Sequence, residues 1–153
     1  MEIKIDKSKI LAEANSCDAV KQALMRIAPN AFKKKDWIEI ESYEDCVEMR
    51  PVDEDDIIYP TDRPHIVAFK QLCHITKTVN GDFVADFENP NQKKWEQIFA
   101  SSGSGFGFSS STYIFGGRAT YAGSRLCCEN QPKSDFIGKN FTKLFQLFIT
   151  NKN

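Results

Sequence analysis

Apolar residues recur at three- and four-residue steps in several stretches of the chain, which is the spacing of one face of an α-helix. The first stretch falls in residues 1–32 and has a plausible N-cap at Asp6. The second begins with Asp62 as its cap and ends at Gly81, and the third covers about residues 133–150 and is apolar around most of its circumference. We therefore predict N-terminal helices, a central helix that faces the core and a C-terminal core helix.

Between the last two helices the pattern changes to alternation, which predicts β-strands. Residues 93–100 form one alternating segment, and Gly116 with Gly117 gives a hairpin signal before the extended segment that follows. In the middle segment we expect one face to carry Phe106, Phe108, Thr112 and Ile114, and the other to carry Tyr113 and Phe115. The predicted fold is α+β: one domain over residues 1–153, with N-terminal helices and a three-stranded antiparallel meander packed against the C-terminal helix within residues 93–150.

Residues 101–123 are rich in glycine and serine, so a phosphate-binding loop and a strand are the two interpretations. Gly103, Gly105 and Gly107 form GxGxG rather than GxGxxG, no GK[ST] follows, and the next segment is β-rich rather than helical. The nucleotide-binding interpretation therefore fails. We expect the glycines to mark bulges or a close approach of the backbone, and we expect Gly138 to be a point of close contact.

Residues 50–64 contain three prolines and a run of four acidic residues, so we predict an exposed loop. Calcium loops alternate their ligands and turn on a glycine, which this run does not do. A solvated acidic loop is favoured over a metal site for Asp53, Glu54, Asp55 and Asp56.

The charge balance limits the classes of partner. The 153 residues are 41% hydrophobic, which suits one domain, and 20 basic against 21 acidic residues give a formal charge of −1. No global positive field would attract nucleic acid or anionic lipid. No apolar run approaches the length of about 20 residues that spans a membrane, and the N-terminus lacks the apolar region of a secretory signal. We expect a soluble, cytoplasmic protein that does not bind membranes.

The cysteines and histidines supply no catalytic arrangement. The five cysteines have no CxxC spacing and are expected to be reduced. His65 and His74 are nine residues apart on one predicted helix, on opposite sides of its axis, so they cannot share a metal or a nucleophile. We predict no catalytic residue, no metal and no cofactor. An enzyme that uses scattered carboxylates, at residues 53–56 or at Glu96, is the weakest hypothesis.

A resemblance rests on motifs that span about half of the chain. They are an Asn-Gly helix end, a loop with Asn and Trp, a glycine-aromatic strand, a Gly-Ser-Arg-Leu-Cys strand and a Gly-Lys-x-Phe helix. The matching residues are Asn80, Trp95, Phe106, Phe108, Gly123 to Cys127, Gly138, Lys139 and Phe141. In these the chain resembles a family of small proteins of phages and integrated elements of Bacteroides-type gut bacteria. The resemblance implies a host-cell cytoplasmic or virion setting and supports the α+β fold, and it implies no activity.

Two functional hypotheses remain beside the enzyme. The first is a phage accessory protein, a virion component or host-modulating factor, that binds itself or another phage or host protein. The second is a single-strand nucleic-acid module in which sheet aromatics such as Tyr113 and Tyr121 stack bases while Arg118 and Arg125 meet phosphates. The simpler interpretation of these four residues, that the aromatics are core and the arginines pair with carboxylates, is favoured, so protein binding ranks first.

Overall fold

The computed structural model describes residues 36–103, 105–115 and 124–151. The chain divides into two compact units, Met1–Asp36 and Trp37–Asn153, and all the helices and strands named below belong to the second. The predicted N-terminal helices lie outside the described residues, as do the candidate residues Arg118 and Tyr121. The single domain over the whole chain stays a prediction.

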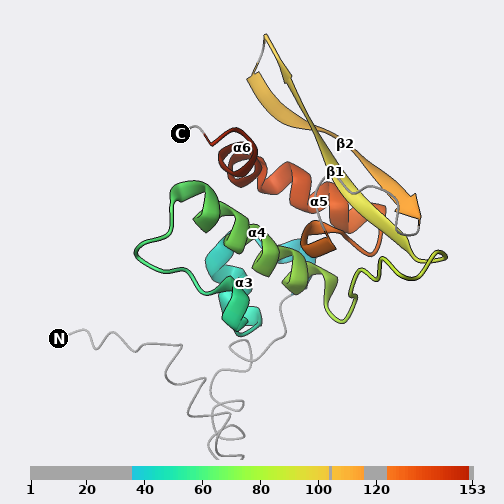
Figure 1. Ribbon diagram of the computed structural model, residues 1–153, viewed down its shortest axis with the longest axis horizontal. Coiled ribbons are helices and arrows are strands. Elements are labelled where there is room, and N and C mark those ends of the chain that lie inside the picture. Colours follow the sequence, from blue (N-terminus) through green and yellow to red (C-terminus); the bar gives the residue numbers. More distant parts are fainter. Residues whose placement is uncertain (1–35, 104, 116–123, 152–153) are drawn as a thin grey trace, which may run out of the picture. The chain divides into compact units, whose positions relative to one another are not determined.

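The described residues form an α+β fold with four α-helices and a two-stranded antiparallel sheet. Helices α5 and α6 lie along the hairpin formed by β1 and β2, and α4 packs on α6, with α3 against α4 (Figure 1). The elements are the 3-10 turn η2 (Trp37–Glu39), α3 (Tyr43–Met49), η3 (Glu54–Asp56), α4 (Pro64–Asn80), β1 (Lys93–Ser102), β2 (Gly105–Phe115), η4 (Ser124–Leu126), α5 (Gln131–Asn140) and α6 (Thr142–Thr150).

Among the described residues, the predicted third strand of the meander is not seen. The described part of that segment is the 3-10 turn η4, followed by a single antiparallel bridge between Cys128 and Trp95, whose backbone groups exchange hydrogen bonds of 2.8 and 2.9 Å. The bridge joins the edge of β1 rather than β2, whereas a meander would have added its third strand to β2. For residues 124–128 the prediction was wrong, because the sequence pattern does not distinguish a paired strand from a short turn followed by one bridge.

A β-bulge changes the face that β2 presents. Ile98 pairs with Ser110, but the next residue, Phe99, pairs with Phe108, so Ser109 is an extra residue on β2. The alternation predicted from the sequence is therefore broken at this point. Residues that pair directly share a face, so the aromatic face of the hairpin carries Lys93, Trp95, Gln97, Phe99 and Ser101 from β1 and Phe106, Phe108, Ser111, Tyr113 and Phe115 from β2.

Two helices replace the single C-terminal helix that the periodicity predicted. The chain leaves helical geometry at Phe141, where φ is −113° and ψ is 25°, and the Thr142 hydroxyl donates a 2.7 Å hydrogen bond to the Gly138 carbonyl. Gly138 itself is required by packing, as expected, because a Cβ there would lie 2.2 Å from Cδ2 of Phe108. Glycine is a poor helix former, and together with the competing Thr142 hydroxyl it accounts for the break.

Side chains cap the starts of α3 and α5, whereas the cap predicted for α4 is not seen. Ser42 and Asp45 form a reciprocal capping box before α3, and the Asn130 side chain accepts from the amide of Lys133 before α5. Asp62 does not cap α4, which begins at Pro64. Its carboxylate instead accepts from the Tyr59 amide at 2.8 Å and from the Lys70 ammonium at 2.7 Å.

The core lies between α4, α5, α6 and the aromatic face of the hairpin. Four of the five cysteines fall in the described ranges, and all four are buried free thiols, as predicted. The buried hydrophobic cluster consists of Ile40, Cys46, Leu72, Cys73, Ile75, Val79, Leu126, Cys128, Ile137, Phe141 and Phe145.

Candidate functional site

Helices cover the middle of the aromatic face. The ring of Phe99 stacks on Phe106 with centroids 5.2 Å apart and lies 4.4 Å from the ring of Phe145 on α6. On α5, the Ser134 hydroxyl is 2.9 Å from the Ser111 hydroxyl. This middle part of the hairpin belongs to the core of the fold.

The other end of the same face is open. Tyr113 is 46% exposed and Phe115 is 45% exposed, and their rings meet edge to face with centroids 5.3 Å apart. The ammonium of Lys93 lies 4.9 Å from the Tyr113 centroid and 5.6 Å from that of Phe115. We call Lys93, Tyr113 and Phe115 the hairpin surface.

Strand register explains why these three residues come together. Lys93 pairs directly with Phe115, and two residues further on Trp95 pairs with Tyr113, so the three share a face and an end of the sheet. Sequence reasoning named Tyr113 but missed Lys93 and gave Phe115 no role. The signal that could have found them is the lysine at the start of the strand two residues before Trp95, combined with the correct register.

Arg125 is not part of this surface. Its guanidinium pairs with the carboxylate of Asp56, which is fully buried, and its Cζ lies 5.8 Å from the centroid of the Phe69 ring. The Lys77 ammonium donates to Asp56 and to Asp53, at 2.7 Å each. The prediction of a solvated acidic loop is therefore wrong for Asp56, which is held inside a cluster of two carboxylates and two cations.

The electrostatics of this charge cluster are those of paired groups. The hydrogen bond from Lys77 lowers the pKa of the Asp53 carboxyl below its usual value. Burial alone would lower the pKa of Lys77, but its bonds to Asp53 and Asp56 outweigh that effect and raise it. The ion pairs of this cluster attach η3 and η4 to α4. Because the cluster contains two positive and two negative charges, it has no net charge that would attract a ligand.

The described thiols are poor nucleophiles. Burial raises the pKa of the Cys73, Cys127 and Cys128 thiols to about 12, so they are protonated at neutral pH. His74 is fully buried on α4, and that burial lowers its pKa. Within the described ranges, no group of three or more His, Cys, Asp or Glu side chains could hold a metal ion.

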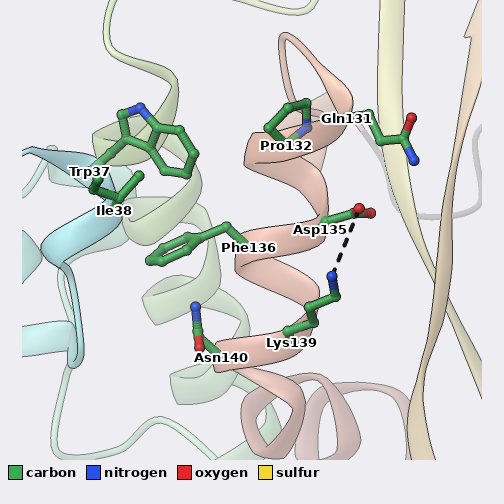
Figure 2. A pocket seen from close by; sticks show the side chains of 8 residues that line it. All are labelled: Trp37, Ile38, Gln131, Pro132, Asp135, Phe136, Lys139 and Asn140. Atoms are coloured by element: carbon green, nitrogen blue, oxygen red, sulfur yellow. Dashed lines mark ion pairs between the residues drawn. The ribbon is translucent and has the colours of Figure 1, made fainter.

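A hollow of about 510 Å³ lies beside α5, but its polar groups do not converge. Trp37 and Phe136 form an edge-to-face pair with ring centroids 5.3 Å apart. Figure 2 shows that Asp135 and Lys139 point away from these rings, toward the strands, and they pair with each other at 4.0 Å. A ligand resting on the aromatic pair would not meet these two charges, so the hairpin surface is the stronger candidate.

In comparisons with protein-family models, curated proteins and solved structures, none matched the chain. No helix among the described residues has the length and apolar character that crossing a membrane requires.

Proposed function

We propose that this protein is a non-enzymatic binding protein whose partner is another protein, and that the hairpin surface is the contact. The setting that best fits its sequence motifs is that of a phage accessory protein, active in the host cytoplasm or as part of the virion. The observation that carries the proposal is the exposure of Tyr113 and Phe115 on a face whose middle is covered by helices.

Three features of the hairpin surface favour a protein partner. Two neighbouring aromatic rings offer a large contact area at a small cost in side-chain entropy, and aromatic residues are enriched in protein interfaces. The rings are held in place by each other and by Trp95, whose centroid is 5.1 Å from that of Tyr113. Lys93 has no ion pair with a carboxylate in the described part of the chain, so it is free to meet an acidic group of the partner.

Single-stranded nucleic acid is the second candidate, because a cation beside exposed aromatic rings also suits bases and phosphates. Its weakness is the position of Arg125, which was expected to meet phosphate and is instead paired with the buried Asp56. One lysine is a small electrostatic contribution for a ligand whose binding depends on neutralising several phosphates. Protein binding is therefore preferred.

An enzymatic role has less support from the described residues. The thiols of Cys73, Cys127 and Cys128 stay protonated at neutral pH. Among the described carboxylates outside the sheet, Asp56 is the most strongly buried, and it is held by two cations.

Site-specific photocrosslinking tests the proposal. A benzophenone amino acid replaces Phe115 in one variant and the exposed Gln146 on α6 in a control, and each is irradiated in cells that naturally contain the protein. We expect a discrete protein adduct from position 115 that is absent from position 146 and is competed away by excess unlabelled protein. An adduct with nucleic acid, together with steeply salt-dependent binding to labelled single strands, would favour the second candidate. No adduct from position 115 would contradict both.

A further inference from the structure

Among the described residues, no strand pairs with the outer edge of β2. In the described part of the chain the sheet has two strands, so β2 pairs with β1 on one side only. The other bridge found among the described residues, between Trp95 and Cys128, lies on the opposite edge, that of β1. An eleven-residue strand therefore presents a row of backbone donors and acceptors to its surroundings.

This edge carries few of the features that normally prevent strand pairing. Edge strands are usually protected by lysine, by proline, by short length or by a bulge. The sequence of β2, GFGFSSSTYIF, contains no charged residue and no proline, and its one irregularity is the bulge at Ser109. The edge is thus suited to accept another strand.

We propose that the edge of β2 pairs antiparallel with β2 of a second copy of this chain, so that two hairpins form a four-stranded sheet. The inference rests on the proposed function, since it names the protein partner of the hairpin. The lack of charged residues on β2 favours a second copy of this chain as the partner. An uncharged edge has no side chain that would pair with the charges of a charged partner strand. A second β2 strand, by contrast, has the same length and is also uncharged.

The position of Lys93 is also compatible with self-pairing. Lys93 lies opposite Phe115, at one end of β2, and a two-fold axis near the middle of β2 sends the two lysines to opposite ends of the sheet. At about 3.4 Å per residue the two ammonium groups are more than about 30 Å apart. Repulsion between them is then screened, because the Debye length is about 8–10 Å at physiological salt.

The bulge fixes the register. Residues that pair across the new edge must share a face, and the aromatic face of β2 carries Phe106, Phe108, Ser111, Tyr113 and Phe115. An axis between Ser109 and Ser110 satisfies this condition. It places Tyr113 opposite Phe106 of the second copy and Ser111 opposite Phe108, so the exposed Tyr113 gains an aromatic cross-strand neighbour.

Charge substitutions at the axis test the pairing. Ser110 is exposed and lies next to the axis, so Ser110→Lys brings two like charges together in the dimer. Ala100→Lys is the matched control, because Ala100 is also exposed and on the same face as Ser110 but belongs to β1, away from the new edge. Thermal melts of each variant establish that it is folded.

Sedimentation equilibrium of the full chain between about 1 and 500 µM is the measurement. We expect a concentration-dependent dimer of twice the 17.4 kDa chain mass for the wild type and Ala100→Lys, and an at least tenfold weaker dimer for Ser110→Lys and for Ser110→Glu. An equimolar mixture of the two charged variants should dimerise again, because their charges attract.

A monomeric wild type over the whole range, a Ser110→Lys variant that dimerises like the wild type, or a mixture that stays monomeric would overturn the inference. These results are separable from the test of the proposed function. A monomeric wild type whose position 115 crosslinks to a different protein keeps the proposed function and rejects self-pairing. A dimer abolished by Ser110→Lys, with no crosslink from position 115, supports self-pairing and rejects the hairpin surface as its contact.

Discussion

Two cations of this molecule each lie over an aromatic ring, but in different surroundings. Arg125 lies over Phe69 and is tied to the buried carboxylate of Asp56, whereas Lys93 lies over Tyr113 and Phe115 and has no ion pair with any described carboxylate. The first arrangement joins η4 to α4 and η3 in the interior. The second is at the surface, within the hairpin, and does not tie the hairpin to another described element.

The difference shows that residue type alone does not separate a structural cation from a binding one. Both are basic residues near aromatic residues in the sequence. Sequence reasoning offered Arg125 as a candidate ligand for phosphate but favoured a pair with a carboxylate, and the structure shows such a pair. What decides the role is whether a buried acid lies within reach. Asp56 reaches Arg125, because η3 turns its carboxylate inward beneath α4.

The largest expected effect on stability comes from removing the anion that holds the interior cation Arg125. Asp56→Asn should lower the free energy of unfolding by about 3 kcal/mol, because it leaves Lys77 and Arg125 partly buried without their shared anion. The adjacent carboxylate Asp55 is exposed, so Asp55→Asn should change stability by less than about 0.5 kcal/mol. Urea denaturation of both variants is the measurement. If both substitutions changed the free energy of unfolding equally, Asp56 would be no more important to stability than an exposed carboxylate.

A second experiment tests how closely α5 packs on the covered part of the hairpin. Gly138→Ala should destabilise the fold by about 1–2 kcal/mol, because its Cβ meets the Phe108 ring, although alanine favours the helix. Gly107→Ala is the control: nothing lies within 4 Å of its Cβ, so its stability should be unchanged or rise by up to about 1 kcal/mol. Thermal and urea unfolding measure both. If Gly138→Ala is as stable as the wild type, α5 does not pack closely on the aromatic face.

The sequence predicted the elements better than their pairing. The helix that ends at Asn80 follows from local spacing, and the structure confirms it. The β1 strand also appears where alternation predicted it. These features depend on a few neighbouring residues, which sequence reasoning can evaluate.

The features that it missed depend on contacts distant in sequence. The bulge at Ser109 reverses the alternation of β2, and nothing in the run of three serines distinguishes it from regular strand. The burial of Asp56 depends on Arg125, which lies 69 residues away. The site was accordingly predicted in part: Tyr113 was named as a candidate and Phe115 was expected on the same face, but Lys93 was missed because its place beside them requires the strand register.

A third, smaller effect concerns pH and the interior region around the charge cluster. Burial lowers the pKa of His74, while Asp56 and Asp53 act in the opposite direction. The unfolded chain therefore takes up this proton near pH 6.5 while the folded chain resists it, so stability should fall as pH drops below about 6.5. His74→Phe should flatten the dependence of unfolding free energy on pH between about 5 and 7. The same slope in the wild type and in His74→Phe would contradict the prediction.

The smallest expected effect on stability is at Lys93, and it is the one that defines the surface region. Lys93→Gln removes a cation that lies over two exposed rings, and such contacts contribute only about 0.5–1 kcal/mol. Its free energy of unfolding should therefore stay within about 1 kcal/mol of the wild type, well below the loss from Asp56→Asn. In the crosslinking experiment, however, the same substitution should weaken an adduct of position 115 with a different protein, because an acidic group of that protein loses its counterion. A dimer formed through the uncharged β2 edges should be unaffected. A Lys93→Gln variant that unfolds as easily as Asp56→Asn and still crosslinks fully would place Lys93 with Arg125, as a structural cation.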